Sequence, residues 1–173
     1  VYIKPNLTQL ETGSYSFTAN AILSNGCTTS QPITINNGSK IWQGLSSDWN
    51  DPNNWKPSGV PTISNCVIIP SNTTISGTNY QAYGKNLTVK PTGNLNVQAG
   101  NNITIDDWVK VDTNGVFRLE NNANLVQIDN TALNSGSIIY KRNATIKQYD
   151  YVYWSSPVDG FNINNISTTT PLG

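Results

Sequence analysis

The sequence predicts an all-β fold built around a short right-handed parallel β-helix, and three observations lead to this prediction. Apolar and polar residues alternate in short runs over residues 87–140, which is the periodicity of β-strands. The runs recur at a step of 22 residues and then 21, so that Leu95 aligns with Phe117 and Phe117 with Ile138. Asn, Thr, Ser and Gly supply the polarity, and these residues favour turns over long helices.

A fixed period of about 20 residues holding short strands and turns is typical of a solenoid, in which each repeat forms one coil. Four further pairs align at the same step: Leu87 with Val109, Val89 with Val111, Val97 with Leu119, and Ile103 with Leu125. Gly93, Gly115 and Gly136 precede strands where the chain must bend, and we expect positive φ angles there. Asn residues precede several strands and suit turns and stacked ladders. An antiparallel β-sandwich with evenly spaced hairpins remains the alternative.

Residues 1–36 do not share the repeat, and we interpret them as the C-terminal part of an Ig-like domain. Alternation over 13–19, a turn at 24–26 and a short apolar run at 33–35 predict two strands. The Gly-x-Tyr-x-Phe pattern around Tyr15 resembles the tyrosine corner of immunoglobulin-like sandwiches. A stray hairpin is the alternative.

A polar linker at 37–40 leads to a predicted Trp-rich cap followed by β-helix coils over 41–148. Trp42, Trp49 and Trp55 fall close together among Asp, Asn and Pro. As a cap, these rings would cover the strand edges and apolar core of the first coil. As a carbohydrate-binding platform, they would stack on the faces of sugar rings. The cap is the favoured interpretation and the platform the alternative.

The loop between the last two of these tryptophans also suggests a calcium site. Asp48, Asn50, Asp51 and Asn53 cluster the oxygen ligands that hard cations take. The same residue types form Asx-turns without any metal, and the loop lacks the Gly and closing Glu of known calcium loops. Calcium is therefore the weaker interpretation.

Residues 67–75 are predicted to form a degenerate first coil, in which Val67 aligns with Val89 and Ile75 with Val97. Two or three fuller coils follow up to Tyr140. Residues 149–173 are then predicted to begin a further β-segment and to be partly disordered.

Composition limits the functions to consider. The chain has 173 residues, enough for one or two domains, with 36% apolar and 12% charged residues. Ten basic residues balance ten acidic ones, which gives no electrostatic argument for nucleic acid or an anionic membrane surface. No run approaches the roughly 20 apolar residues of a membrane span. Cys27 and Cys66 lie in different predicted domains and fit neither a zinc site nor a disulfide framework. Since the sequence starts without Met or a leader, we expect a longer precursor.

The absence of His excludes triads that depend on an imidazole, so paired carboxylates are the remaining route to catalysis. The candidates are Asp106, Asp107 and Asp112, with Lys110 and Arg118 near them in sequence. Adjacent Asp106 and Asp107 would point to opposite faces of a strand. A few short coils also leave little room for the long cleft of polysaccharide-cleaving β-helices. We therefore predict no catalytic residues and no cofactor, with such an enzyme as the lesser alternative.

Several motifs follow one another in a specific order over roughly residues 41–160. They are Ile41-Trp42-x-Gly44, Asn54-Trp55, Val60-Pro61, Val67-Ile68-Ile69-Pro70, Asn86-Leu87-Thr88-Val89 and Tyr153-Trp154-Ser155-Ser156-Pro157-Val158. This combination resembles the β-helix-like repeat module of very large secreted and cell-surface proteins of Bacteroidota, notably Flavobacteria. The preceding segment with Asn25-Gly26-Cys27 is similar to the Ig-like or PKD-like arrays upstream of such modules.

The resemblance implies export through the type IX secretion system, with the outer-membrane export machinery as a partner. It also implies an extracellular, outer-membrane-associated location and an adhesin-like protein, with some relatives tied to gliding motility. The expected function is a non-catalytic structural or adhesive module whose further partners are surface glycans or matrix. A carbohydrate-binding module is the alternative.

Overall fold

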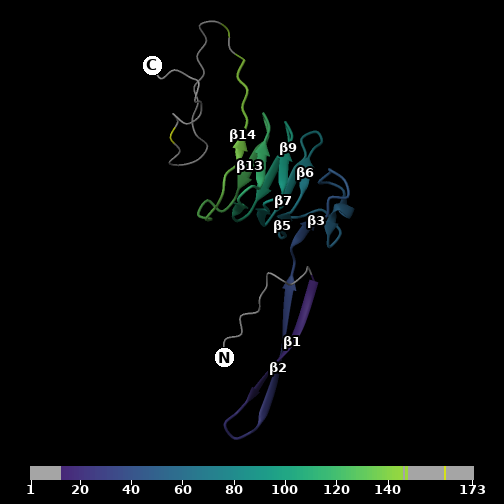
Figure 1. Cartoon of the computed structure of the whole chain (residues 1–173), viewed down its shortest axis with the longest axis vertical. Helices are drawn as coiled ribbons and strands as arrows, with labels where there is room; N and C mark the ends of the chain where they lie inside the picture. Colours follow the sequence, from purple (N-terminus) through teal and green to yellow (C-terminus); the bar gives the residue numbers. More distant parts are fainter. Residues whose placement is uncertain (1–12, 146, 148–161, 163–173) are drawn as a thin grey trace. The chain divides into compact units, whose positions relative to one another are not determined.

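The computed structural model describes residues 13–145, 147 and 162, which form β-strands joined by turns and loops (Figure 1). Within these residues there is no α-helix, and a 3-10 turn, η2, spans Pro52–Asn54. The chain divides into two units, Val1–Arg142 and Asn143–Gly173. The predicted further β-segment at 149–173 lies outside the described residues, apart from Asn162.

Strands β1 (Gly13–Ile22) and β2 (Thr28–Asn37) form an antiparallel hairpin that turns at residues 23–27. Their register pairs Phe17 with Ile33, and these side chains are 45% and 46% exposed. The two predicted strands are therefore confirmed. The Ig-like assignment stays a prediction, because two strands do not make a sandwich.

The chain from β5 onward is a parallel β-solenoid, and each coil adds one strand to each of three sheets (Figure 1). The first coil holds β5 (Cys66–Ile69), β6 (Asn72–Ile75) and β7 (Gln81–Gly84). The second holds β8 (Asn86–Val89), β9 (Asn94–Val97) and β10 (Asn102–Ile105). The third holds β11 (Val109–Val111), β12 (Val116–Leu119) and β13 (Asn124–Gln127), and β14 (Ile139–Tyr140) begins a fourth.

The three sheets are named here by the order in which the chain visits them. Sheet 1 contains β5, β8 and β11, sheet 2 contains β6, β9, β12 and β14, and sheet 3 contains β7, β10 and β13. The strands within each of these sets pair in parallel. The predicted parallel β-helix is therefore confirmed, and the alternative of an antiparallel sandwich is wrong.

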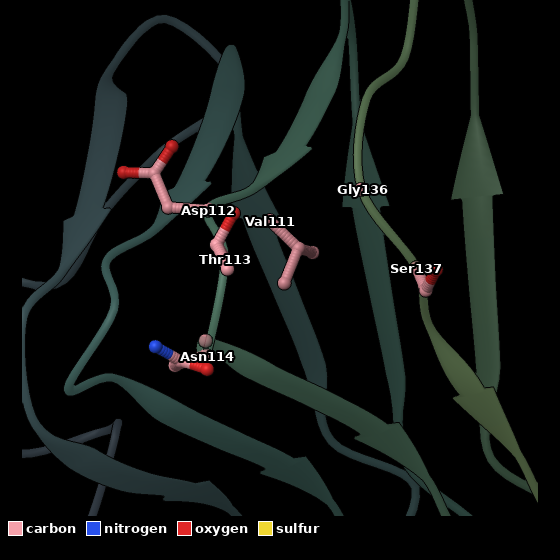
Figure 2. A pocket seen from close by; sticks show the side chains of 7 residues that line it. Val111, Asp112, Thr113, Asn114, Gly136 and Ser137 are labelled. Atoms are coloured by element: carbon pink, nitrogen blue, oxygen red, sulfur yellow. The ribbon is translucent and has the colours of Figure 1, made fainter.

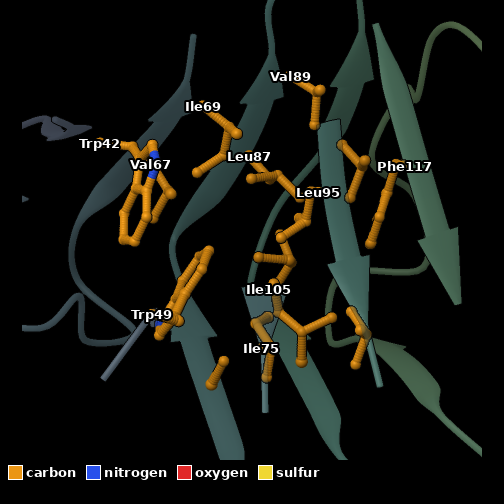
Figure 3. Close-up of a cluster of buried hydrophobic side chains, with 14 of the residues drawn as sticks. Trp42, Trp49, Val67, Ile69, Ile75, Leu87, Val89, Leu95, Ile105 and Phe117 are labelled. Carbon is orange, nitrogen blue, oxygen red and sulfur yellow. The ribbon is translucent and has the colours of Figure 1, made fainter. Parts of the chain in front are cut away.

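The 22-residue step in the sequence is the spacing between stacked residues in the structure. Leu95 pairs in register with Phe117, and Leu119 pairs with Tyr140 at the shorter step of 21 that the sequence also showed. Leu95 and Phe117 are both fully buried, at 0% exposure (Figure 3). Because neighbouring strands lie about 4.8 Å apart, equivalent inward side chains form continuous columns along the solenoid.

The predicted alignment of the first coil is wrong in sheet 1. Val67 pairs with Leu87 and not with Val89. Two residues separate β5 from β6, whereas four separate β8 from β9, so the first corner is two residues shorter. Because strand side chains alternate with a period of two, this shift leaves Val67 facing the core at 0% exposure.

Glycines mark the corners, but for a different reason from the predicted one. Gly136 has a positive φ of 88°, whereas Gly93 and Gly115 do not take this conformation. A Cβ atom on Gly93 would instead collide with the carbonyl oxygen of Ile69 in the preceding coil. At the corner between β11 and β12, which contains Gly115, the residue with a positive φ is Asn114, at 69°. These corners therefore need glycine for close stacking of backbones.

Opposite charges stack between successive coils at all three corners. The ion pairs are Lys85 Nζ to Asp106 Oδ2 at 3.4 Å, Lys90 Nζ to Asp112 Oδ2 at 3.6 Å, and Lys141 Nζ to Glu120 Oε2 at 3.0 Å. They follow sheets 3, 1 and 2 respectively. Each pair is partly exposed and contributes at most about 1 kcal/mol. Their arrangement places these charges at the corners and off the flat sheet faces.

Candidate functional site

The three predicted site tryptophans form a buried cluster at the start of the solenoid. Figure 3 shows two of them, Trp42 and Trp49. The Trp55 ring meets the other two edge-on, with ring centroids 5.1 Å from Trp42 and 4.7 Å from Trp49. Trp55 Nε1 donates to the Trp49 carbonyl oxygen at 2.9 Å, and Trp42 Nε1 donates to the Asn72 carbonyl oxygen at 2.9 Å. Packing therefore fixes all three indoles, and hydrogen bonds from the indole N–H groups fix those of Trp42 and Trp55 in addition.

Strand pairing holds this cluster against the first coil. β3 (Lys40–Trp42) lies between β4 (Trp55–Lys56) and β5 in the extended sheet 1, while Asp48 bridges in parallel to Thr74 in sheet 2. The segment therefore covers the strand edges of two sheets. With exposures of 0–2%, the rings present no face on which a sugar could stack. This geometry is that of a cap and does not provide the sugar platform.

The predicted calcium ligands lie in the loop between β3 and β4. Asp48 Oδ1 accepts a hydrogen bond from Asn50 N–H at 3.0 Å, and Asp51 Oδ1 accepts one from Asn53 N–H at 2.9 Å. Both contacts are Asx-turns, the metal-free interpretation of this loop. Among the described residues, no three His, Cys, Asp or Glu side chains gather as a metal site would require. Calcium binding stays a prediction.

Asn54 organises the same loop, a role that the sequence did not indicate although Asn54-Trp55 is one of its motifs. This side chain is completely buried. Its Nδ2 atom donates to Ser46 Oγ at 2.6 Å and to the Asp48 carbonyl oxygen at 2.8 Å, while its Oδ1 accepts from Ser46 N–H at 2.8 Å. In a chain rich in Asn, nothing distinguishes such a buried residue from the many Asn residues of exposed turns.

The candidate catalytic carboxylates do not come together as a pair. Asp106 lies in its ion pair at the corner after sheet 3, and Asp112 lies at the corner after sheet 1. The intervening strand β11 separates the two corners. Arg118 belongs to the outward set of side chains on sheet 2, in register with Asn96. These positions share neither a corner nor a sheet face.

Asp112 is held in its ionised form by two lysines. Its Oδ1 lies 3.2 Å from Lys110 Nζ, and its Oδ2 lies 3.6 Å from Lys90 Nζ. The hydrogen bond from Lys110 and the positive charge of both lysines lower the pKa of Asp112, against the opposing effect of desolvation. A general acid at neutral pH needs a raised pKa, so this carboxylate is unsuited to that role.

An open pocket of about 260 Å³ lies beside Asp112 (Figure 2). It is lined by the corner residues 111–115 together with Gly136 and Ser137. Asp112 is the one carboxylate in this lining, and it is already engaged by the lysines. The pocket therefore lacks the two carboxylates that glycoside hydrolysis uses.

The outward face of sheet 3 is an ordered polar surface that the sequence predicted only in part. Gln81 Nε2 donates to Thr104 Oγ1 at 2.7 Å, and Asn124 Nδ2 donates to Asn102 Oδ1 at 2.8 Å. Both hydrogen bonds join successive coils. The sequence predicts Asn ladders. It does not predict the hydrogen bond between Gln81 and Thr104, nor that Tyr83, beside Thr104, is 42% exposed. The signal was present in the repeat, whose step aligns these outward positions.

No helix in the described part of the chain has the length and apolar character needed to cross a membrane. Searches among curated proteins and among solved structures found no match. A family model described as "Domain of unknown function (DUF8693)" matches residues 41–173. The match begins in β3, at the Trp cap, and includes all the coils. Because it covers well over half of the sequence, the chain belongs to the DUF8693 family.

Proposed function

We propose that this chain is a non-catalytic structural or adhesive module of a larger extracellular or cell-surface protein. The stack of coils is the observation that carries the proposal. Its inward side chains form one continuous apolar core, and its corner charges are paired between coils. Such a stack is a stiff element in which each coil supports its neighbours, which suits a spacer or a display surface.

The state of the acidic candidates supports a non-catalytic role. Asp106 and Asp112 are bound to lysines at separate corners, and the pKa of Asp112 is lowered. A polysaccharide-cleaving enzyme would need acid and base groups that converge on one substrate bond. These two carboxylates instead link one coil to the next.

The proposed location and export route rest on the ordered motifs of residues 41–160. Their resemblance to modules of large Bacteroidota proteins supports export by the type IX secretion system and retention at the cell surface. Mass spectrometry of the intact natural protein would show whether a C-terminal sorting domain follows residue 173. Loss of the protein from the surface fraction of a strain lacking type IX secretion is the expected result. Undiminished surface display in that strain would contradict this route.

The non-catalytic role can be tested by mixing the purified chain with polysaccharides, matrix proteins and cells. We expect binding to at least one of them, with no new reducing ends or unsaturated products from any polysaccharide. Turnover that disappears in Asp112→Asn would contradict the proposal and indicate an enzyme. Turnover could also be the same in Asp112→Asn and in the outward control Arg118→Ala. That result would equally overturn the proposal, and it would place the catalytic groups elsewhere than at these two positions.

A further inference from the structure

The outward face of sheet 3 has the properties of a ligand surface. Its six outward side chains occupy two columns that run along the solenoid: Gln81, Asn102 and Asn124 in one, and Tyr83, Thr104 and Val126 in the other. The columns repeat at the strand spacing of about 4.8 Å. The residue types differ along each column, but their even spacing matches the even spacing of successive units in an extended polymer.

The polar side chains of this face are already ordered. The hydrogen bonds from Gln81 to Thr104 and from Asn124 to Asn102 hold amide and hydroxyl groups in fixed positions across the three coils. A ligand therefore meets groups that lose little conformational freedom on binding, which lowers the entropic cost of association. Amides and hydroxyls both donate and accept hydrogen bonds, as do the hydroxyl groups of sugars.

Two apolar surfaces flank Thr104 in its column. Tyr83 is 42% exposed and Val126 is 48% exposed, and each pairs in register with Thr104 from one side. An exposed phenol ring offers an apolar face with a polar tip, which matches the apolar face and hydroxyl rim of a pyranose. The three tryptophans cannot supply this contact, because they are buried in the cap.

The charge of the face selects among ligands. None of its six outward residues is Asp, Glu, Lys or Arg. The Lys85–Asp106 ion pair lies at the corner, and at the Asn124 end of the face the Arg142 guanidinium donates to Asn124 Oδ1 at 3.4 Å. An acidic polymer would therefore meet one cation, at the Asn124 end, and no partner of opposite charge along the two columns themselves, so electrostatic complementarity favours an uncharged polymer.

From these observations we propose that the outward face of sheet 3 binds a neutral polysaccharide chain lying across its strands. The inference rests on the proposed adhesive function and names the chemical class of its ligand. Tyr83 provides the stacking contact, and the amide and hydroxyl ladder provides the hydrogen bonds.

Affinity electrophoresis of the full chain in gels containing soluble polysaccharides tests this site. The probes are xyloglucan, galactomannan, mixed-linkage β-glucan and amylopectin, with alginate and polygalacturonate as acidic comparisons. We expect retardation by at least one neutral probe. Tyr83→Ala should weaken it about tenfold, the usual effect of removing a central aromatic anchor, while Tyr83→Phe should keep it. Ile139→Ala is the matched control, because Ile139 is 44% exposed on the outward side of sheet 2.

The results separate this site from the adhesive function as a whole. Absence of retardation by every neutral probe would overturn the site, and so would equal losses in Tyr83→Ala and Ile139→Ala. Binding only to acidic glycans or to matrix proteins would also overturn it while leaving an adhesive module. Cleavage of a retarding polysaccharide would instead overturn the non-catalytic function and leave the mapping of the binding face intact.

Discussion

Phe117 lies in the middle of an inward column, because its strand β12 pairs with β9 of the preceding coil and with β14 of the next. It lies in register with Leu95 and is completely buried. Phe117→Ala should lower the free energy of unfolding by about 3–5 kcal/mol, because it removes buried surface and leaves a cavity between coils. Since domains of this size have only about 5–15 kcal/mol of stability, the midpoint of urea unfolding should fall strongly.

The neighbouring residue provides the control for this measurement. Arg118 faces outward from the same strand, so Arg118→Ala should change the free energy of unfolding by less than about 0.5 kcal/mol. Equal effects of the two substitutions would contradict the inward and outward assignment of strand β12.

Gly93 tests the close approach of backbones at a corner. Gly93→Ala places a methyl group against the carbonyl oxygen of Ile69, a backbone atom that cannot rotate away. We expect a loss of about 1–3 kcal/mol, the usual cost of overpacking. Gly38→Ala is the matched control, because a Cβ atom there meets nothing within 4 Å. If thermal unfolding shifts equally for both variants, the corner is looser than the structure indicates.

At the scale of elements, the strands and their stacking could be predicted because one physical rule generates both. Strand side chains alternate between core and solvent, and parallel stacking repeats that pattern in every coil. The corners follow no such rule, since they can lose or gain residues while the strands keep their faces. For this reason the alignment of Val67 with Val89 is two residues away from its true partner, Leu87. For the same reason the positive φ expected at Gly93 is wrong.

The candidate site was less predictable than the coils. The sequence places Trp42, Trp49 and Trp55 together, but a cap and a sugar platform use the same residues. Only their burial distinguishes the two, and burial depends on pairing with β5 and β6. The sheet 3 face likewise depends on contacts between side chains a whole coil apart, such as Gln81 with Thr104.

Two aspartates, Asp112 at the corner between sheets 1 and 2 and Asp129 in the loop after sheet 3, give the solenoid a predicted pH dependence. The pKa of Asp112 is lowered in the folded protein, chiefly by its hydrogen bond with Lys110, and the pKa of Asp129 is lowered by hydrogen bonds with Thr131. An unfolded Asp titrates near pH 3.9, so below about pH 4 the unfolded state binds more protons than the folded state. Stability should be fully present above this range and should decline as the pH falls through it.

Urea unfolding between pH 6 and pH 3 measures this effect. Asp112→Asn should reduce the dependence of the unfolding free energy on pH, because the variant has no carboxylate to protonate at that corner. Thr113→Ala leaves the carboxylate in place at the same corner and should retain the dependence. An Asp112→Asn variant with the full pH dependence would mean that the lysine contacts are too weak to matter.

At the scale of the whole molecule, the Trp cap and the coils share one apolar core. The buried cluster runs from Trp42 and Trp49 through Ile75 to Phe117 (Figure 3), and it also includes Leu119. In a repeat protein, each coil is stabilised by the contacts with its neighbours, and the first coil has no preceding coil. The cap supplies that missing contact, so its removal should destabilise all the coils that follow it.

A cap that shares its core with the coils should unfold together with them. In a Trp108→Phe, Trp154→Phe background, tryptophan fluorescence reports the cap alone, while far-ultraviolet circular dichroism reports strands throughout the chain. We expect the two signals to give the same urea midpoint, which is the signature of one cooperative transition. Trp49→Ala should lower both midpoints together, by about 3–5 kcal/mol of unfolding free energy, because its fully buried ring packs against the first coil. A fluorescence midpoint well below that of circular dichroism would show instead that the cap unfolds first, while the coils remain folded without it.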